Sequence, residues 1–537
     1  MSIGPVDLPK DIESLRALAL RQQAELDQNA QQLERLAEQT ERIAFLEEYI
    51  RLLKHQRFGR SSEKSHTSQL GLFNEAECIA DAFDAEEVEA NETIAVPSHT
   101  RRKRGRRPIP AEIPRVEILH DLSEEEKICA QDGHRLQEIG RETSEQLEII
   151  PAVIQVLRHV RPKYACPHCK SGVKIAPLPP QPIPKSLAAP GLLAHIAISK
   201  YGDGLPLYRQ EKMLQRLGVD LPRATLAHWM IRSGELGQPL LNLMREELVA
   251  GDIVGADETR FQVLKEPGKA ATSLSYLWVW RGGTEEHPLL LYDYDPSRGG
   301  EVPKRHLEGF RGYLQVDGYK GYNEVCEANG LVRVGCFAHA RRKFDEALKA
   351  QGKGTKKGKK RSVKVTKARQ GLDLIRVLYR IERKVAGQPP DVRYRVRQEH
   401  AKPRLEKIRQ WLDASLGSVP PQSLTGKALA YLDHQWDRLI HYLDDGRLRI
   451  DNNLVENSIR PFVVGRKAWL FSDTVRGAQA SANLYSLVET AKANGIEPYA
   501  YLRHVFTKIP KATTLEHIEA LLPHRIDPAE IQRNVNG

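Results

Sequence analysis

Cysteine is scarce in this chain, with six residues in 537. So few thiols in so long a chain do not make a disulfide framework, and reduced thiols or a metal site fit them better. Long apolar runs are also missing, since none approaches the roughly 18 residues of a membrane span. The N-terminal segment MSIGPVDLPKDIESL lacks the apolar core of a signal peptide. We therefore expect a soluble, cytoplasmic protein with no membrane partner.

Basic residues are absent from one stretch and crowded into the next. No Lys or Arg occurs between Lys64 and Arg101, where the chain is acidic, and RRKRGRR then follows. A second basic block, residues 353–369, contains no acid. The formal net charge of the whole chain is +11. An excess of this size favours a polyanionic partner, chiefly nucleic acid.

The chain is too long for one core, so we expect two to four domains. Residues 1–64 are typical of a coiled-coil dimerisation region, because residues 11–55 lack Pro and Gly and apolar residues recur seven apart. The recurring positions are Leu26 and Leu33; Leu36, Ile43 and Ile50; and Leu46 and Leu53. A coiled coil implies a homodimer or higher oligomer. A long helix packed on its own domain is the alternative.

Residues 65–110 are predicted to be an acidic linker followed by a basic segment that resembles an AT-hook. Its extended Gly- and Pro-containing arginine run could lie along a minor groove. A polybasic linker that touches phosphates without base preference is the alternative. The candidate DNA-binding residues here are Arg101, Arg102, Arg104, Arg106 and Arg107.

Residues 111–185 contain a candidate structural zinc site. Cys166 and Cys169 form CPHC, which is the tight half of a zinc knuckle, and Cys129 supplies a third thiol. The fourth ligand could be His134, Asp132 or His168, and we prefer His134. A module without zinc is the alternative.

Residues 186–248 are predicted to form a helical DNA-binding domain. The segment LPLYRQEKMLQRLGVDLPRATLAHWMIRSGEL has the length and rhythm of a helix-turn-helix, and a purely structural helical hairpin is the alternative. From about residue 250 the pattern changes to strands, in the order β-β-β-α-β-α-β. This order predicts a mixed five-stranded sheet with helices, in a multidomain α/β protein.

Three acids stand out on this framework. Asp257 lies near or inside the first strand, and Asp317 lies at the end of the fourth, where ligands bind α/β sheets. Glu456 lies on a late helix that Asp451 or Asn452 could cap. Three clustered carboxylates require cations, and two Mg²⁺ ions, or Mn²⁺ in their place, would serve phosphodiester chemistry. Turn-capping aspartates and a surface helix with a Glu–Arg pair are the alternatives.

The ordered motifs RFGRSSEKS, HIAISKYGDGLPLYRQEKML, ADETRFQV, QVDGYKGY, CFAHARRKF and DNNLVENSIRPFVVGRKAWLFSDTVRGAQASANLYSLVET identify a resemblance over nearly the whole chain. The chain resembles a DDE transposase of the insertion sequence 66 family, the large (TnpC-type) subunit. The resemblance implies a ribonuclease H-like catalytic domain, residues 249–345 and 446–505, interrupted by a basic helical insertion, residues 346–445. It places the catalytic, metal-binding triad on Asp257, Asp317 and Glu456. The chain departs from the family's zinc pattern at Asp132, where a second Cys is expected.

The resemblance also implies a function. A bacterial, nucleoid-associated enzyme would bind the terminal inverted repeats of an insertion sequence, then cut and join DNA without a covalent protein–DNA intermediate. Small accessory proteins of the same element would be possible partners. A ribonuclease H-like nuclease and a DNA-binding repressor derived from a transposase are the alternatives.

Other expectations concern side chains near the triad and the C-terminus. Trp469 and Phe471 are expected in the core, and a base-stacking wedge is the alternative. Residues 506–537 are expected to form a tail. Candidate DNA contacts near the triad are His339, Arg341, Arg342, Arg460, Arg466 and Lys467.

Overall fold

The computed structural model describes residues 12–58, 154–161, 163–165, 173–350, 366–527 and 531. The chain divides into two compact units, residues 74–176 and the remainder. In the smaller unit, β1 (Lys163–Ala165) and β2 (Val173–Ile175) form an antiparallel ladder. In the larger unit, α1 (Ile12–Phe58) is one helix of 47 residues. None of the helices in the described ranges is both long and apolar enough to span a membrane.

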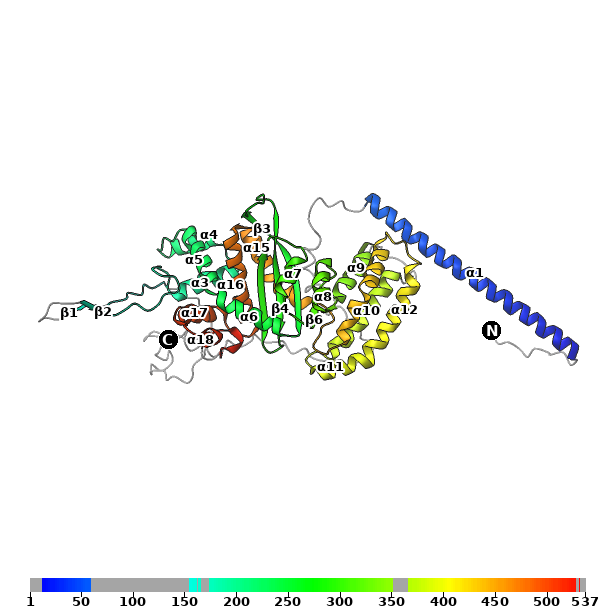
Figure 1. The fold of residues 1–537 in the computed structure, drawn as a ribbon. Helices are drawn as coiled ribbons and strands as arrows, with labels where there is room; N and C mark the ends of the chain where they lie inside the picture. The colour runs from blue at the N-terminus through cyan, green and yellow to red at the C-terminus, as the bar shows by residue number, and fades with distance from the viewer. Residues whose placement is uncertain are drawn as a thin grey trace, which may run out of the picture. The chain divides into compact units, whose positions relative to one another are not determined.

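A mixed β-sheet organises the larger unit (Figure 1). Its strand order is β5-β4-β3-β6-β7, with β3–β4 and β4–β5 antiparallel and β3–β6 and β6–β7 parallel. The strands are β3 (Ile253–Lys265), β4 (Leu274–Gly283), β5 (Pro288–Asp295), β6 (Tyr313–Gln315) and β7 (Val332–Val334). The predicted multidomain α/β fold with a mixed sheet is confirmed. A short sixth strand, β8 (Ser472–Thr474), was not predicted, and it pairs in parallel with the far end of β3.

Helices α3 (Pro190–Tyr201), α4 (Leu207–Arg216), α5 (Arg223–Leu236) and α6 (Gln238–Ala250) lead directly into the sheet. The predicted helix-turn-helix corresponds to α4 and α5. Gly234 of α5 packs flush against α16 (Val475–Ala493), because a Cβ at Gly234 would lie 2.7 Å from the Cα of Ala480. One face of the second helix of the pair is therefore buried against the later part of the chain.

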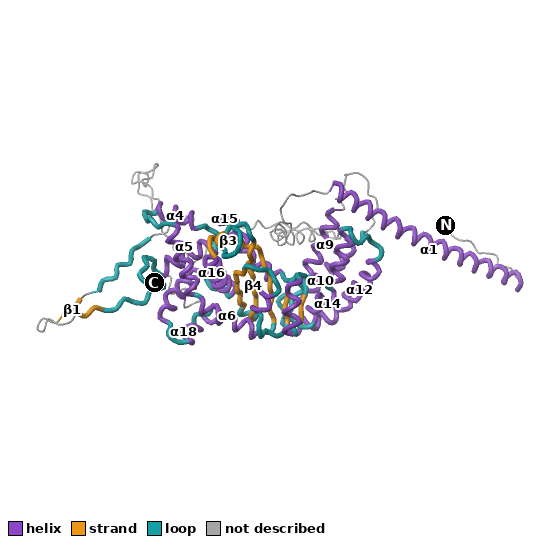
Figure 2. Tube along the Cα trace, turned by 45° about the horizontal axis from the view of Figure 1, so that its top comes forward, coloured by secondary structure: helices purple, strands orange, loops and turns teal. Residues whose placement is uncertain are grey.

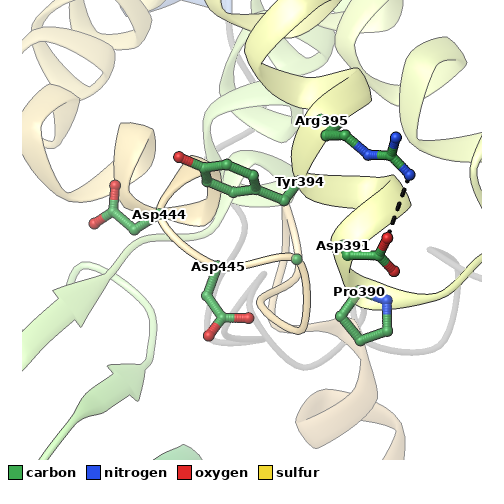
Figure 3. Close-up of a pocket in the computed structure, with 7 residues that line it drawn as sticks. Pro390, Asp391, Tyr394, Arg395, Asp444 and Asp445 are labelled. Atoms are coloured by element: carbon green, nitrogen blue, oxygen red, sulfur yellow. Dashed lines mark hydrogen bonds and ion pairs between the residues drawn. The ribbon is translucent and has the colours of Figure 1, made fainter.

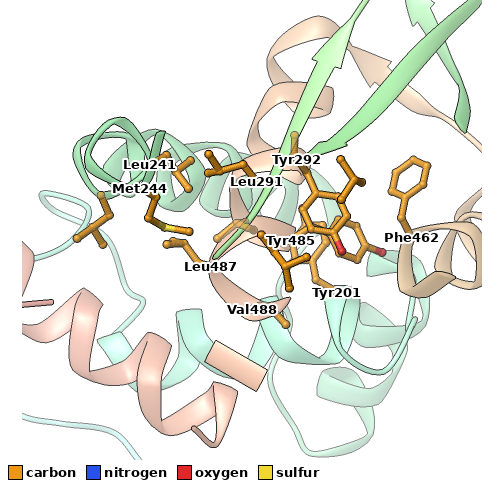
Figure 4. Close-up of a cluster of buried hydrophobic side chains, with 14 of the residues drawn as sticks. Tyr201, Leu241, Met244, Leu291, Tyr292, Phe462, Tyr485, Leu487 and Val488 are labelled. Atoms are coloured by element: carbon orange, nitrogen blue, oxygen red, sulfur yellow. The ribbon is translucent and has the colours of Figure 1, made fainter. Parts of the chain in front are cut away.

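Helix α16 also covers the edge of the sheet. The backbone N–H of Tyr292 on edge strand β5 donates to Ser486 Oγ (2.8 Å), and that of Leu290 donates to Thr490 Oγ1 (3.1 Å). These side chains satisfy backbone groups that an edge strand would otherwise offer to another chain. Figure 4 shows the apolar cluster beside this contact, where Tyr201, Phe462 and Tyr485 meet.

The opposite face of the sheet carries large aromatic side chains. Trp278 and Trp280 stack with ring centroids 5.7 Å apart, and Trp278 meets Tyr322 edge-on. The elements on this side are α7 (Glu301–His306), the 3₁₀ turn η1 (Lys320–Tyr322) and α8 (Asn323–Asn329). Both faces of the central strands are therefore buried, as parallel pairing in α/β proteins requires.

A helical segment with its own core interrupts the sheet domain. Figure 2 shows α9, α10 and α12 side by side. The fully buried Arg397 guanidinium ties the segment together, since it pairs with Glu382 (2.7 Å) and donates to three backbone carbonyls. The helices are α9 (Phe337–Ala350), α10 (Lys367–Lys384), α11 (Pro390–Val396), α12 (Lys402–Leu416), α13 (Leu424–His434) and α14 (Trp436–Ile440), with η2 (Arg397–Ala401) and η3 (His441–Leu443) between them.

The chain then returns to the sheet through α15 (Asn453–Trp469) and α16. It ends with α17 (Pro498–Lys508), η4 (Ile509–Lys511), α18 (Leu515–Glu519) and η5 (Pro523–Arg525). The sequence analysis expected residues 506–537 to form a tail. For the residues of this range that the structure describes, that expectation is wrong. Leu521 and Leu522 are buried in the main core, because their apolar side chains pack with it.

Candidate active site

Two acids lie side by side on the central strands. Gly255 of β3 is in register with Gln315 of β6, in a parallel pair. Asp257 and Asp317 each follow two residues later, so alternation places both carboxyls on the face that Gly255 and Gln315 share. Asp257 lies inside β3, and Asp317 follows the end of β6, as the sequence predicts.

The helix that carries the third acid is fixed to this same face. A Cβ at Gly255 would lie 2.5 Å from Val455 Cγ2, so only glycine allows α15 to approach β3 so closely. Asn452 Nδ2 donates to the carbonyl of Ala256 (3.0 Å), beside Asp257. Gln315 Nε2 donates to the carbonyls just before α15, at Arg449 (2.6 Å) and Asp451 (3.1 Å). Two amide side chains thus tie the helix to both acid-bearing strands.

Glu456 follows Asn452 by one helical turn and is buried on this face. Burial raises the pKa of the Asp257 carboxyl well above its usual range, and the charges of Glu258, Glu456 and Asp317 raise it further. Such a group resists ionising beside its neighbours unless a cation compensates them. The oxygen-only set of Asp257, Asp317 and Glu456 fits hard divalent cations such as Mg²⁺.

The start of α15 differs from the predicted cap. Asn452 is the N-cap residue, but its side chain makes no capping hydrogen bond, because it bonds to β3 instead. Asp451 Oδ1 accepts from the backbone N–H of Asn453 (3.2 Å). Of the two capping candidates, only Asp451 satisfies a free N–H, and Asn452 serves tertiary packing.

Glu258 is an acid of the site that the sequence analysis missed. Its side chain is 3% exposed and points to the other face of β3, where it accepts hydrogen bonds from Tyr322 (2.8 Å) and Arg298 (2.8 Å). Burial raises its pKa, and the charge of Asp317 adds to that rise. The position of Glu258 directly after Asp257 could have indicated that it belongs to the site. No sequence pattern near Glu258 predicts Arg298 as its partner.

Basic side chains of α9 approach Glu456. His339 Nδ1 lies 3.7 Å from Glu456 Oε1, and Arg342 Nη2 lies 3.7 Å from Glu456 Oε2. Arg341 points elsewhere, over the ring of Tyr379. Of the three candidate DNA contacts on this helix, two therefore border the acids.

Cys336 lies against the same side chains, since Cys336, His339 and Glu456 hold ligand atoms within 4.8 Å of one another. The Cys336 thiol accepts the backbone N–H of Asn452 (3.2 Å), and burial raises the pKa of this thiol. A protonated thiol is no ligand for Mg²⁺, which prefers oxygen. Cys336 therefore serves to pack the start of α15.

The other candidate DNA contacts extend from the acids along α15. Arg460 lies one turn beyond Glu456, and Arg466 and Lys467 lie in the last turns. A separate surface hollow lies beside α11 (Figure 3), where Asp391 pairs with Arg395 (3.3 Å). Its lining holds none of the three triad acids and no candidate DNA contact.

Two predicted sites fall outside the described residues. They are the zinc ligands Cys129, His134, Cys166 and Cys169, and the basic segment Arg101, Arg102, Arg104, Arg106 and Arg107. The β1–β2 ladder brackets the sequence segment that holds Cys166 and Cys169.

Comparison with known proteins gives consistent matches along the chain. The family described as "Transposase IS66 family" matches residues 185–480, and the "IS66 C-terminal element" matches residues 486–524. The "zinc-finger binding domain of transposase IS66" matches residues 126–170, which contain all four predicted zinc ligands. The "Transposase C of IS166 homeodomain" matches residues 45–118.

Three relatives from Sinorhizobium fredii are similar over most of their length. The uncharacterized protein y4jD is 32% identical over 97% of this chain and 98% of its own. The uncharacterized protein y4qI is 32% identical over 99% of this chain and 100% of its own. The uncharacterized protein y4hP is 30% identical over 86% of this chain and 85% of its own. The chain therefore belongs to the IS66 family of transposases.

Proposed function

We propose that this protein binds the terminal inverted repeats of a bacterial insertion sequence and catalyses DNA cleavage and strand transfer. Asp257, Asp317 and Glu456 would be its DDE triad. The observation that carries this proposal is that the three acids converge on one face of the sheet. The raised pKa of Asp257 supports this, because the charges of Glu456 and Asp317 contribute to it. Perturbed carboxyls in such a cluster are typical of functional sites.

The strand order supports a ribonuclease H-like catalytic domain. Three antiparallel strands lead into two parallel ones, with the first acid on the first strand and the second after the fourth. The third acid returns on α15 after the helical insertion. On this proposal the domain boundaries follow those expected from the sequence, apart from the packed C-terminal residues.

The three carboxylates would hold two Mg²⁺ ions, for which Mn²⁺ could substitute. When bound, such a pair activates an attacking hydroxyl and stabilises the leaving oxygen of a phosphodiester. His339 and Arg342, which already lie beside Glu456, would orient the DNA backbone. The side chains only bind and position the reacting groups, so no covalent protein–DNA intermediate is needed.

The N-terminal half would recognise and pair the DNA ends. A structural zinc held by Cys129, His134, Cys166 and Cys169, the basic segment and the helices α4 and α5 would contact DNA. The exposed side chains of Leu36, Ile43 and Ile50 on α1 support a coiled coil with a second copy. We place the enzyme at the nucleoid in the cytoplasm, where small accessory proteins of the element could join it.

The test uses the full-length protein, a labelled duplex with the element's own end, and a target plasmid. We compare wild type with Glu456→Gln, in Mg²⁺ and in EDTA. The matched control is Glu489→Gln, since Glu489 is also a buried helical glutamate but lies on α16, paired with Lys492 (2.9 Å). We expect Mg²⁺-dependent nicking and joining in wild type and Glu489→Gln. Glu456→Gln should bind the end but lose both reactions.

Other outcomes would contradict this function. Cleavage without joining would indicate a nuclease, provided that the accessory proteins have been supplied. Specific end binding with no chemistry, under the same condition, would indicate a repressor. Equal activity in wild type and Glu456→Gln would remove Glu456 from the triad.

A further inference from the structure

The chain makes an unusual turn where α15 ends. Leu470 has φ 66° and ψ −52°, and the N–H of Phe471 donates to the carbonyl of Trp469 (2.8 Å). This combination is a γ-turn with positive φ, a rare and strained conformation for a residue with a branched side chain. Strain of this kind persists where the surrounding structure enforces it, often at functional sites.

The turn sends neighbouring side chains in opposite directions. Trp469 points inward and meets Phe261 and Phe462 edge-on, with ring centroids 5.8 and 5.3 Å apart. Leu470 is 63% exposed and Phe471 is 42% exposed. The expectation that both aromatic residues belong to the core is therefore right for Trp469 and wrong for Phe471. Leu470 and Phe471 together form what we call the apolar tip.

Two cations that have no acidic partner among the described residues lie over the rings of Phe462 and Trp469, on the inner side of the turn. The backbone N–H of Leu470 donates to the carbonyl of Arg466 (2.6 Å). The guanidinium of Arg466 lies over the ring of Phe462. Burial lowers the pKa of the Arg466 guanidinium. Repulsion from Arg260, the residue before Phe261, lowers the pKa of Arg466 further, so the two cations are close. Lys200 Nζ lies 4.7 Å from the ring centroid of Trp469.

Within the described ranges, no carboxylate forms a hydrogen bond or ion pair with Arg260, Arg466 or Lys200. The nearby acid Asp473 is paired with Lys265 (2.8 Å). Uncompensated like charges at close range favour an external anion. An apolar surface beside such cations fits nucleic acid, which offers phosphates and base faces together.

The apolar tip follows the C-terminal end of the helix that carries Glu456. Glu456, Arg460 and Lys467 lie along one side of α15. The helix ends at Trp469, and the turn at Leu470 then leads into Phe471. A rise of about 1.5 Å per residue puts the apolar tip roughly 20 Å from Glu456 along the helix. At about 3.4 Å per base pair, that distance corresponds to roughly six base pairs of duplex.

We propose that Leu470 and Phe471 form a wedge that stacks on a base of the transposon-end duplex, about six base pairs from the cleaved bond. Arg260 and Arg466 bind the phosphates beside it. The inference rests on the proposed function, because the acids define where the DNA lies. It adds a second point of DNA contact, which reads the duplex by unstacking it.

The experiment places single 2-aminopurines in the end duplex, at positions from about three to nine base pairs on each side of the cleaved bond, a range set by the helix rise. Fluorescence is measured with the full-length protein in EDTA, so that no cleavage occurs. We expect a change in fluorescence near the sixth position in wild type. Phe471→Ala should abolish it and weaken end binding about tenfold, the loss typical of one stacked base.

Two controls separate the wedge from general effects. Val464→Ala removes an exposed apolar side chain from the same helix and should leave the signal unchanged. Glu456→Gln should also retain the signal, so failure of the catalytic proposal does not resemble failure of the wedge. A wedge signal without cleavage in Mg²⁺ would support the wedge alone. Normal cleavage with no fluorescence change at any position, or with wild-type affinity in Phe471→Ala, would overturn it.

Discussion

Replacing Asn452 by Leu tests whether the amide ties place Glu456 over the strand acids. Leu has a similar size but no donor, so the buried carbonyl of Ala256 loses its bond from Asn452 Nδ2 (3.0 Å). An unsatisfied buried acceptor costs about 1–3 kcal/mol of stability. If about 1 kcal/mol of this tie holds Glu456 in its metal-binding position, the Mg²⁺ concentration for half-maximal cleavage should rise on the order of fivefold.

The assay is a Mg²⁺ titration of end cleavage at saturating DNA, with thermal unfolding measured in parallel in EDTA. The matched control is Asn457→Leu, because Asn457 is the neighbour of Glu456 on α15 but is exposed. Asn457→Leu should leave both the Mg²⁺ dependence and the stability near wild type. End binding in EDTA should be the same in all three proteins, because the tie acts on the acids.

A loss of stability in Asn452→Leu with an unchanged Mg²⁺ titration would refute the reasoning. The tie would then stabilise the domain without positioning Glu456. A shift of equal size in Asn457→Leu would also refute it, because Asn457 is exposed on α15. Gln315→Leu provides an independent check, since Gln315 ties the same helix to β6.

Three further predictions follow from other parts of the chain. Because burial and neighbouring acids raise the folded-state pKa of Asp257, its contribution to stability is present at low pH and lost as pH rises through that raised pKa. Asp257→Asn should therefore melt at a higher temperature than wild type in EDTA near neutral pH, and calorimetry should show the gap closing toward about pH 4; a destabilised variant would contradict this. Replacing Leu36, Ile43 and Ile50 by Asp should convert the oligomer to a monomer in light scattering, with an unchanged oligomer as the opposing result. Metal analysis should find one zinc per chain, lost in Cys166→Ser; full zinc content in that variant would exclude this ligand.

Local periodicity was enough to place the strands and the main helices. Three alternating apolar runs, two short helices and two further strands gave the right order because a strand or helix is coded by neighbouring residues. The sixth strand was missed, because Ser472–Thr474 has no strand pattern of its own. It forms only where the turn after α15 brings it against β3.

The first two acids were accessible from sequence for the same reason. Asp257 and Asp317 lie in or just after apolar strands, so their positions follow from the strand pattern. Glu258 was not accessible, because its role depends on Arg298 and Tyr322, which lie 40 and 64 residues away. No local pattern specifies such a pairing between distant side chains.

The helix 453–469 shows the division most clearly. By itself the sequence determined that a helix carries Asn452, Glu456 and Arg460 along one side, since their four-residue spacing matches the helical repeat. Only the tertiary structure decided that Asn452 bonds to β3 rather than caps the helix, and that Phe471 faces outward. The first outcome depends on how closely α15 approaches β3 at Gly255, which is set by packing between segments far apart in the chain. The second depends on the turn that the chain makes at Leu470.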